Sequence, residues 1–309
     1  MITHYEKVHE NINSLLAFLN QLGIDGELKS HLESDYLLAT DFLENFENGQ
    51  QDQLTEDGRA AVGGLHELYK WLWSIKDCDE FDALIPHLKM LSQSATRINS
   101  KTTMLSPVTE KQDDKTNKLI ETIVAMFAVK VGSEIDLDDP ILSSGGDNPD
   151  IIFNYEGNRI SIACKTLRGE SVNTILDNFR SAAKQIKRAD CDFGYIAINA
   201  MNILPHNNIV ENVYLDLEEP FHELTSGLIS TYRSLPEVAE EDLAEIFDSS
   251  KVRPVILTFV HSNTKLSSMA GNVSTMIKST FASRLLERDS KQFDIDFLAM
   301  VNEFIHQRL

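Results

Sequence analysis

The chain has 309 residues, of which 42% are hydrophobic and 25% charged, and its formal net charge is −20. This length allows one large domain or two to three small ones, and the apolar fraction is enough to build packed cores. No apolar run approaches the ~20 residues of a membrane-spanning helix, and the first residues lack the apolar core of a signal peptide. Three widely spaced cysteines without a C-x-x-C pair argue against a disulfide framework or zinc ribbon, so we expect a cytoplasmic protein without a membrane partner.

Residues 1–100 show helical periodicity. Apolar residues recur at three- and four-residue spacing over 9–22, 28–47 and 56–74, and Pro86 begins a further short helix. The aromatic residues Tyr69, Trp71 and Trp73 are more typical of helix packing than of base stacking. Residues 101–113 lie in a stretch rich in Ser, Thr, Lys and Asp, which predicts a linker to a second domain over 114–309.

The most informative segment begins at Pro149-Asp150. Two apolar segments flank the turn-like residues 155–158, a pattern that predicts a β-hairpin. Because side chains alternate along a strand, Ala163 and Lys165 share one face, and we expect Asp150 to lie beside Lys165. A carboxylate next to a lysine on a rigid strand pair suits divalent-metal phosphodiester hydrolysis, in which the carboxylate binds the cation and the lysine orients the attacking water.

These residues resemble the motif of the PD-(D/E)XK nuclease superfamily. Pro149-Asp150 stands where that family has PD, and Ala163-Cys164-Lys165 stands where it has (D/E)-X-K. The chain departs from the motif at Ala163, which replaces the second acidic residue. Ala163 is either an engineered inactivating replacement or a natural residue, with another acid filling in or the metal chemistry lost, and the sequence leaves both open.

The resemblance implies an α/β protein with a restriction-endonuclease-like fold, in which a mixed central sheet is flanked by helices in the order αβββαβ. A helix over 116–130, a weak strand between 130 and 142, the hairpin, a helix over 172–189 and a strand over 193–198 follow that order. It also implies a catalytic Mg²⁺ (or Mn²⁺) site. Asp150, Glu121 and a backbone carbonyl at Ala163-Cys164 would hold the cation, and Lys165 would stabilise charge on the phosphate.

Positive charge concentrates on the expected helix over 172–189. Arg180, Lys184, Lys187 and Arg188 lie on one side of it and apolar residues on another, and Arg168 precedes it. A chain with this acidic balance needs a local basic stripe to contact phosphates, so the stripe predicts DNA binding, with a solvated helix face as the alternative. Gln185 lies between the two faces, either aimed at the site or at the surface.

The last hundred residues predict an elaboration of the same domain. They contain an acidic helical stretch over 235–247, a strand over 253–260 that extends the sheet, and helices over 269–287 and 294–308. No histidine spacing typical of zinc hydrolases and no glycine-rich nucleotide loop is present in the sequence.

The sequence therefore predicts a Mg²⁺-dependent deoxyribonuclease, an endonuclease that acts as the effector of a bacterial anti-phage defence or restriction system. The defence role rests on analogy of fold alone. The alternative is a catalytically inactive nuclease-fold module that binds nucleic acid or docks a partner protein such as a helicase or ATPase. Both interpretations leave a homo-oligomer open.

Overall fold

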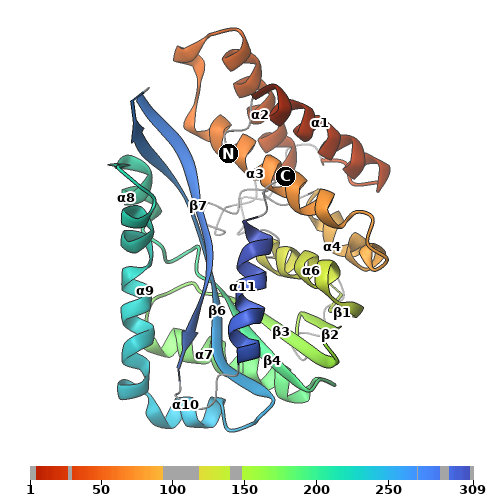
Figure 1. Ribbon diagram of the computed structural model, residues 1–309, viewed down its shortest axis with the longest axis vertical. Coiled ribbons are helices and arrows are strands. Elements are labelled where there is room, and N and C mark those ends of the chain that lie inside the picture. Colours follow the sequence, from red (N-terminus) through yellow and green to blue (C-terminus); the bar gives the residue numbers. More distant parts are fainter. Residues whose placement is uncertain are drawn as a thin grey trace.

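The computed structural model describes residues 5–26, 30–92, 118–139, 148–269, 271–285 and 292–306. A mixed β-sheet lies at the centre with helices on both faces, and the helices of the first ninety residues extend one of the two layers (Figure 1). The predicted α/β class, with a mixed sheet flanked by helices, is confirmed. The predicted linker over 101–113 lies outside the described residues.

The first ninety residues form a set of packed helices: α1 (Tyr5–Gln21), α2 (His31–Glu47), α3 (Glu56–Ile75) and α4 (Ile85–Met90), with short 3₁₀ turns over Gln51–Gln53 and Phe81–Leu84. Side chains cap two of them. Ser30 accepts the backbone N–H of Glu33 at the start of α2, and Thr55 accepts that of Gly58 at the start of α3. The predicted N-terminal helices are confirmed, although α2 begins at His31.

The middle of the chain runs in the order α6 (Leu119–Val131), β1 (Ser133–Leu137), β2 (Ile151–Tyr155), β3 (Asn158–Thr166), α7 (Val172–Arg188) and β4 (Phe193–Asn199). Strands β1, β2 and β3 pair antiparallel, and β3 pairs parallel with β4. Glu156 and Gly157 form the β2–β3 turn with φ of 48° and 74°, the backbone that tight two-residue hairpins favour. The predicted hairpin and its neighbouring elements are confirmed.

The rest of the chain adds α8 (His206–Glu211), β5 (Val213–Tyr214), α9 (Glu218–Val238), α10 (Glu240–Ile246), β6 (Val252–Ser268), β7 (Gly271–Arg284) and α11 (Gln292–Ile305). Strand β6 pairs parallel with β4, then with β5, and antiparallel with β7 along its length. It extends the central sheet, as the sequence predicts. The β6–β7 hairpin reaches past the sheet towards α3 (Figure 1).

The predicted helix over 269–287 is wrong, because residues Gly271–Arg284 within this range form strand β7. Ile277 and Phe281 recur at a four-residue spacing, which fits one face of a helix and equally one face of a strand. Thr275, Ile277 and Thr280 are β-branched, and such residues favour strands. Pairing with β6 from Gly271 to Arg284 decides between the two.

Two apolar clusters line the two faces of the sheet. One joins α1–α4, α6 and α11 to strand residues such as Ile162, Cys164 and Tyr195. The other packs α7–α10 against residues that include Ala163 and Ile196. The alternation along β3 thus sends Cys164 and Ala163 to opposite faces. The N-terminal helices and the first face of the sheet share one continuous core.

Two further contacts fix the layers in place. Gly194 lets β4 lie close to its neighbours, because a Cβ at this position would come within 2.8 Å of both Ser161 O and Ile186 Cγ2. On the other face, the buried Asp294 of α11 accepts a hydrogen bond from Tyr195 Oη at 2.6 Å. Within the described ranges, every helix is too short or too polar to cross a bilayer.

Candidate active site

The candidate site lies where β2 begins, next to β3 and to the first turn of α6. The β2–β3 register pairs Ile151 with Ile162, so its continuation sets Asp150 opposite Ala163. Lys165 lies two residues further along β3 and therefore projects from the same face as Ala163. The structure thus brings Asp150 and Lys165 to one face of the hairpin.

Asp150 is held by the backbone of β3. Its side chain accepts the N–H of Cys164 at 2.6 Å through Oδ2, and the residue is 9% exposed. In an extended strand the N–H and C=O of one residue point to the same edge, so the carbonyl of Cys164 faces the edge where Asp150 lies. The second oxygen of Asp150 and this carbonyl are two oxygen ligands of the kind that hard cations prefer.

Glu121 approaches the same place from α6. Its side chain is 16% exposed, and its Oε2 lies 2.7 Å from Nζ of Lys118, one helical turn earlier. Burial, and next the negative charge of Asp150, raise the pKa of Glu121 to about 8, against the opposing effects of Lys118 and Lys165. Glu121 and Asp150 are therefore close enough to repel each other.

Burial also raises the pKa of Asp150, although the charge of Lys165, the Cys164 N–H and the charge of Lys118 all act in the opposite direction. The site accordingly holds two carboxyl groups that resist ionisation beside two lysines. A divalent cation would favour the ionised form of both, since it offers each carboxylate a partner charge.

Ala163 leaves this ligand set one acid short. Its side chain is fully buried in the apolar cluster under α7, and its partner on β4 is Ile196. Across the described ranges, no group of three or more His, Cys, Asp or Glu side chains is placed to hold a metal ion. Asp150, Glu121 and a backbone carbonyl fit the donor chemistry of Mg²⁺, with fewer charges than the motif normally supplies.

Cys164 contributes to the site through its backbone. Its thiol lies in the apolar cluster on the other face, where burial raises its pKa well above the ordinary value. It therefore stays a neutral, buried thiol.

Gln185 of α7 is a second buried polar group beside the segment that leads to Asp150. It is 3% exposed, its Nε2 donates to the carbonyl of Asn148 at 2.6 Å, and its Oε1 has no hydrogen-bond partner among the described atoms. A buried carbonyl oxygen without a donor is costly, which makes it a ready acceptor for a water molecule or cation at the site. Gly145 and Gly146, which precede this segment in the sequence, lie outside the described residues.

Two of the predicted DNA-binding cations form ion pairs with acidic residues of the protein itself. Arg180 lies 2.5 Å from Asp242 of α10, and Lys187 lies 2.5 Å from Asp248, just after α10. Part of the basic stripe therefore holds α10 against α7.

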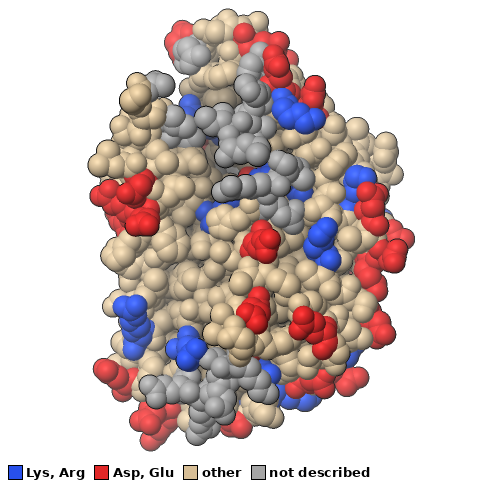
Figure 2. Space-filling model, viewed as in Figure 1, with Lys and Arg blue, Asp and Glu red and all other residues tan. Residues whose placement is uncertain are grey.

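The other predicted contacts, Arg168, Lys184 and Arg188, are exposed. Lys184 forms no ion pair with any residue that the structure describes. Arg168 lines a cavity of about 610 Å³ at the carboxyl ends of β3 and β4. The face shown in Figure 2 carries basic side chains scattered among acidic ones.

Lys118 is the site residue that the sequence analysis missed. Its spacing of three from Glu121, at the start of a helix, is the signal that would have found it, because such residues are neighbours on a helix surface.

No known protein-family model matches the chain, and no curated protein matches it significantly. The interpretation of the site therefore rests on the residues of this chain.

Proposed function

We propose that this protein has a PD-(D/E)XK nuclease fold and a Mg²⁺-dependent DNA endonuclease site from which one carboxylate is missing. The observation that carries the proposal is the pair of buried carboxyl groups, Asp150 and Glu121, both with raised pKa values, beside Lys165 and the backbone of Cys164. A cation site built from oxygen ligands explains why acids from two separate elements are brought together out of water.

The order of the elements supports the fold part of the proposal. The segment from α6 to β4 runs helix, three strands, helix, strand, with antiparallel pairing followed by a parallel step. This is the αβββαβ order that the resemblance implies. The remaining elements extend this core on one side of the sheet and cover its faces.

Each side chain has a definite role in the proposed reaction. A bound Mg²⁺ or Mn²⁺ would supply Lewis-acid activation of the scissile phosphate and of the attacking water. The Cys164 N–H holds one oxygen of Asp150, which would leave the other oxygen to bind the cation. Glu121 would lose its proton when a cation binds, and Lys118, which lies 2.7 Å from it, would balance its charge. Lys165 would donate to a phosphate oxygen and stabilise negative charge that develops there.

Restoring the missing acid is the direct test. We expect Ala163→Glu to give Mg²⁺- or Mn²⁺-dependent cleavage of DNA, measured on supercoiled plasmid and short duplexes, and the added change Lys165→Ala to abolish it. The matched control is Ala163→Gln, which has the same size without the charge. Because Ala163 is fully buried, Ala163→Asp serves as the shorter acid, and circular dichroism checks the fold of each variant.

Absence of cleavage by folded Ala163→Glu and Ala163→Asp proteins on duplex DNA, single-stranded DNA and RNA would overturn the enzymatic proposal. Equal cleavage by Ala163→Gln would instead overturn the claim that a carboxylate is missing from the site, since it would show that the charge at position 163 has no role.

A second candidate is a non-catalytic module of the same fold that binds nucleic acid or a partner protein. The pairing of Arg180 and Lys187 with acids near α10 favours it, because those cations already have a structural role. In a bacterial defence or restriction system, a helicase or ATPase partner would then supply DNA affinity to this acidic chain. Metal-independent DNA binding or stable co-purification with such a partner, without cleavage by either acid variant, would select this candidate.

A further inference from the structure

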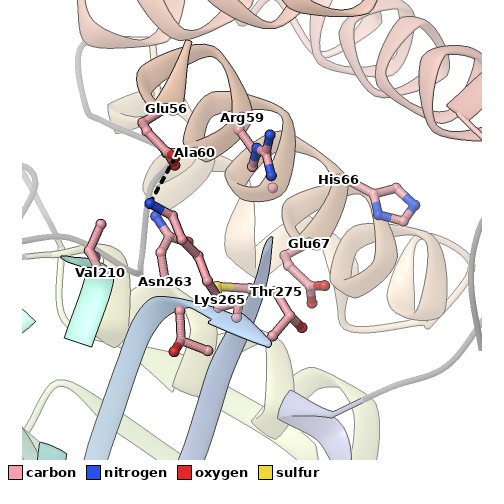
Figure 3. Close-up of a pocket in the computed structure, with 12 residues that line it drawn as sticks. Glu56, Arg59, Ala60, His66, Glu67, Val210, Asn263, Lys265 and Thr275 are labelled. Atoms are coloured by element: carbon pink, nitrogen blue, oxygen red, sulfur yellow. Dashed lines mark ion pairs between the residues drawn. The ribbon is translucent and has the colours of Figure 1, made fainter. Parts of the chain in front are cut away.

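A cavity of about 170 Å³ lies between α3 and the β6–β7 hairpin, with α8 at its edge. Its polar lining includes Glu56, Arg59, His66 and Glu67 from α3 and Asn263 and Lys265 from β6 (Figure 3). The elements of the candidate active site, α6, β2, β3 and α7, do not line it. The cavity is therefore a separate place in the molecule.

Arg59 is the least satisfied cation of this cavity. The side chain makes no hydrogen bond or ion pair with any described residue, and its Nε is buried without a partner. Its guanidinium carbon lies 5.7 Å from the centre of the Phe42 ring. A guanidinium group presents several donors in a planar fork, so a partly buried Arg59 without an acceptor leaves a strong site for an oxyanion.

The surrounding charges also favour an anion. Lys265 Nζ lies 3.3 Å from Glu56, an ion pair that spans the cavity in Figure 3. Glu67 is bonded to two lysines, Lys278 and Lys70. The lining itself has two cations, Arg59 and Lys265, and two carboxylates, Glu56 and Glu67, and the lysines that pair with Glu67 lie next to it. The four cations of this group outnumber its two carboxylates, in a chain whose net charge is −20, and this local excess of positive charge favours an anionic ligand.

His66 completes the lining as a neutral group. Burial lowers its pKa to about 4, with further contributions from the nearby Lys70 and Lys278. At neutral pH its ring is therefore uncharged, and its Nε2 already accepts a hydrogen bond from Asn11 Nδ2 at 3.2 Å, which leaves the Nδ1–H as its donor.

We propose that this cavity binds a small phosphate-bearing ligand, with Arg59 and Lys265 on its phosphate group. The fork of Arg59 suits bidentate contact with phosphate oxygens, and the volume accommodates a phosphate group with a few attached carbons. Because the two cations belong to α3 and β6, the ligand would tie the N-terminal helices to the hairpin.

The test uses inorganic phosphate and glycerol 3-phosphate as probes on the full chain, in a buffer free of phosphate and sulfate. We expect saturable one-to-one binding by titration calorimetry and a rise in melting temperature, because a ligand that binds the folded state alone stabilises it. Tighter binding of glycerol 3-phosphate would identify a phosphomonoester, and tighter binding of phosphate would identify the free ion. Arg59→Gln should weaken binding roughly 10- to 100-fold, the value of charge-assisted hydrogen bonds.

The matched control is Lys7→Gln, which removes an exposed cation of α1 that is paired with Glu10, and it should leave binding unchanged. If Arg59→Gln fails to fold, Arg59→Lys keeps the charge without the fork and should also weaken binding. Lys265→Gln tests the opposite wall. The proposal is overturned if chloride at equal ionic strength stabilises the protein as much as phosphate, or if folded Arg59 and Lys265 variants bind as tightly as the unaltered chain.

Discussion

Glu121 is a carboxyl group that the folded protein keeps protonated up to a pH of about 8. Because its folded pKa lies above the unfolded value, its contribution to stability is full below the unfolded pKa and is lost as the pH rises through about 8. We expect the free energy of unfolding to fall by about 1 kcal/mol between pH 7 and pH 8, because the folded state holds up to one more proton than the unfolded chain in this range. Urea unfolding at a series of pH values measures this.

Glu121→Gln is the control for this pH dependence, since the amide cannot ionise, and it should flatten the slope. His66 and His261 have lowered pKa values, about 4 and about 3, so they are neutral in the folded protein throughout this window. Added Mg²⁺ should oppose the loss of stability at pH 8 in the unaltered chain and not in Glu121→Gln. Identical slopes in the two proteins would show that Glu121 does not titrate as described.

Two glycines give opposite expectations for the same substitution. Gly194→Ala should destabilise by roughly 1–3 kcal/mol, because the new Cβ meets Ser161 and Ile186 at 2.8 Å or closer in a packed core. Gly227→Ala in α9 should stabilise by about 0.5–1 kcal/mol, because its Cβ meets nothing within 4 Å and alanine favours a helix. Thermal unfolding measures both, and equal effects of the two changes would contradict this packing.

The sequence predicts that Asp150, Lys165 and Glu121 lie close together, because local rules of strand and helix geometry apply to all three. Strand alternation and a two-residue turn determine which residues of a hairpin share a face, and helical spacing places Glu121 on α6. The pairing of Arg180 with Asp242 involves positions 62 residues apart, and no local pattern reports it. The sequence therefore predicts the basic stripe on α7 but does not predict the acidic residues that pair with it.

At the scale of the helix, the structure separates two cations that the sequence groups together. Lys184→Gln should weaken DNA binding and reduce the slope of log affinity against log salt by about 0.9 if it contacts one phosphate of a duplex. Arg180→Gln should instead lower the melting temperature, since it breaks the contact of α7 with α10, and leave the salt slope unchanged. Fluorescence anisotropy with a labelled duplex measures binding.

The reverse result, an altered salt slope in Arg180→Gln and an unaltered one in Lys184→Gln, would reject this division of roles. An unchanged slope in both variants would show that the stripe does not contact DNA.

Strand β7 is the element whose secondary structure the local sequence pattern does not predict correctly. Its apolar spacing suits a helix and a strand equally, and the choice is made by a partner strand that runs beside it. The strands β2, β3 and β4 are easier to predict from the sequence, because the β2–β3 turn and the short, apolar β4 each have a local sequence pattern typical of strands. Elements whose identity depends on tertiary pairing are the ones that the sequence leaves ambiguous.

Across the whole molecule, the net negative charge disfavours contact with nucleic acid, whereas the function proposed for the candidate site requires it. A net charge of −20 repels a polyanion, whereas phosphodiester chemistry requires contact with one. Cationic side chains are gathered at the site, on α7 and around the cavity beside α3, and many of them are already paired with acids. The proposed association with DNA should therefore depend strongly on salt or on a partner surface.

The β6–β7 hairpin also has a consequence for the speed of folding. Its two strands adjoin in sequence, so they can pair early, whereas the contact of Lys278 with Glu67 joins residues 211 positions apart and must close a very long loop. The same holds for Tyr195 and Asp294, which are 99 positions apart. The hairpin can thus exist in the refolding chain before the helices that cover it have docked. During that interval its apolar face is exposed, and the rate of docking sets how long the chain is prone to aggregate.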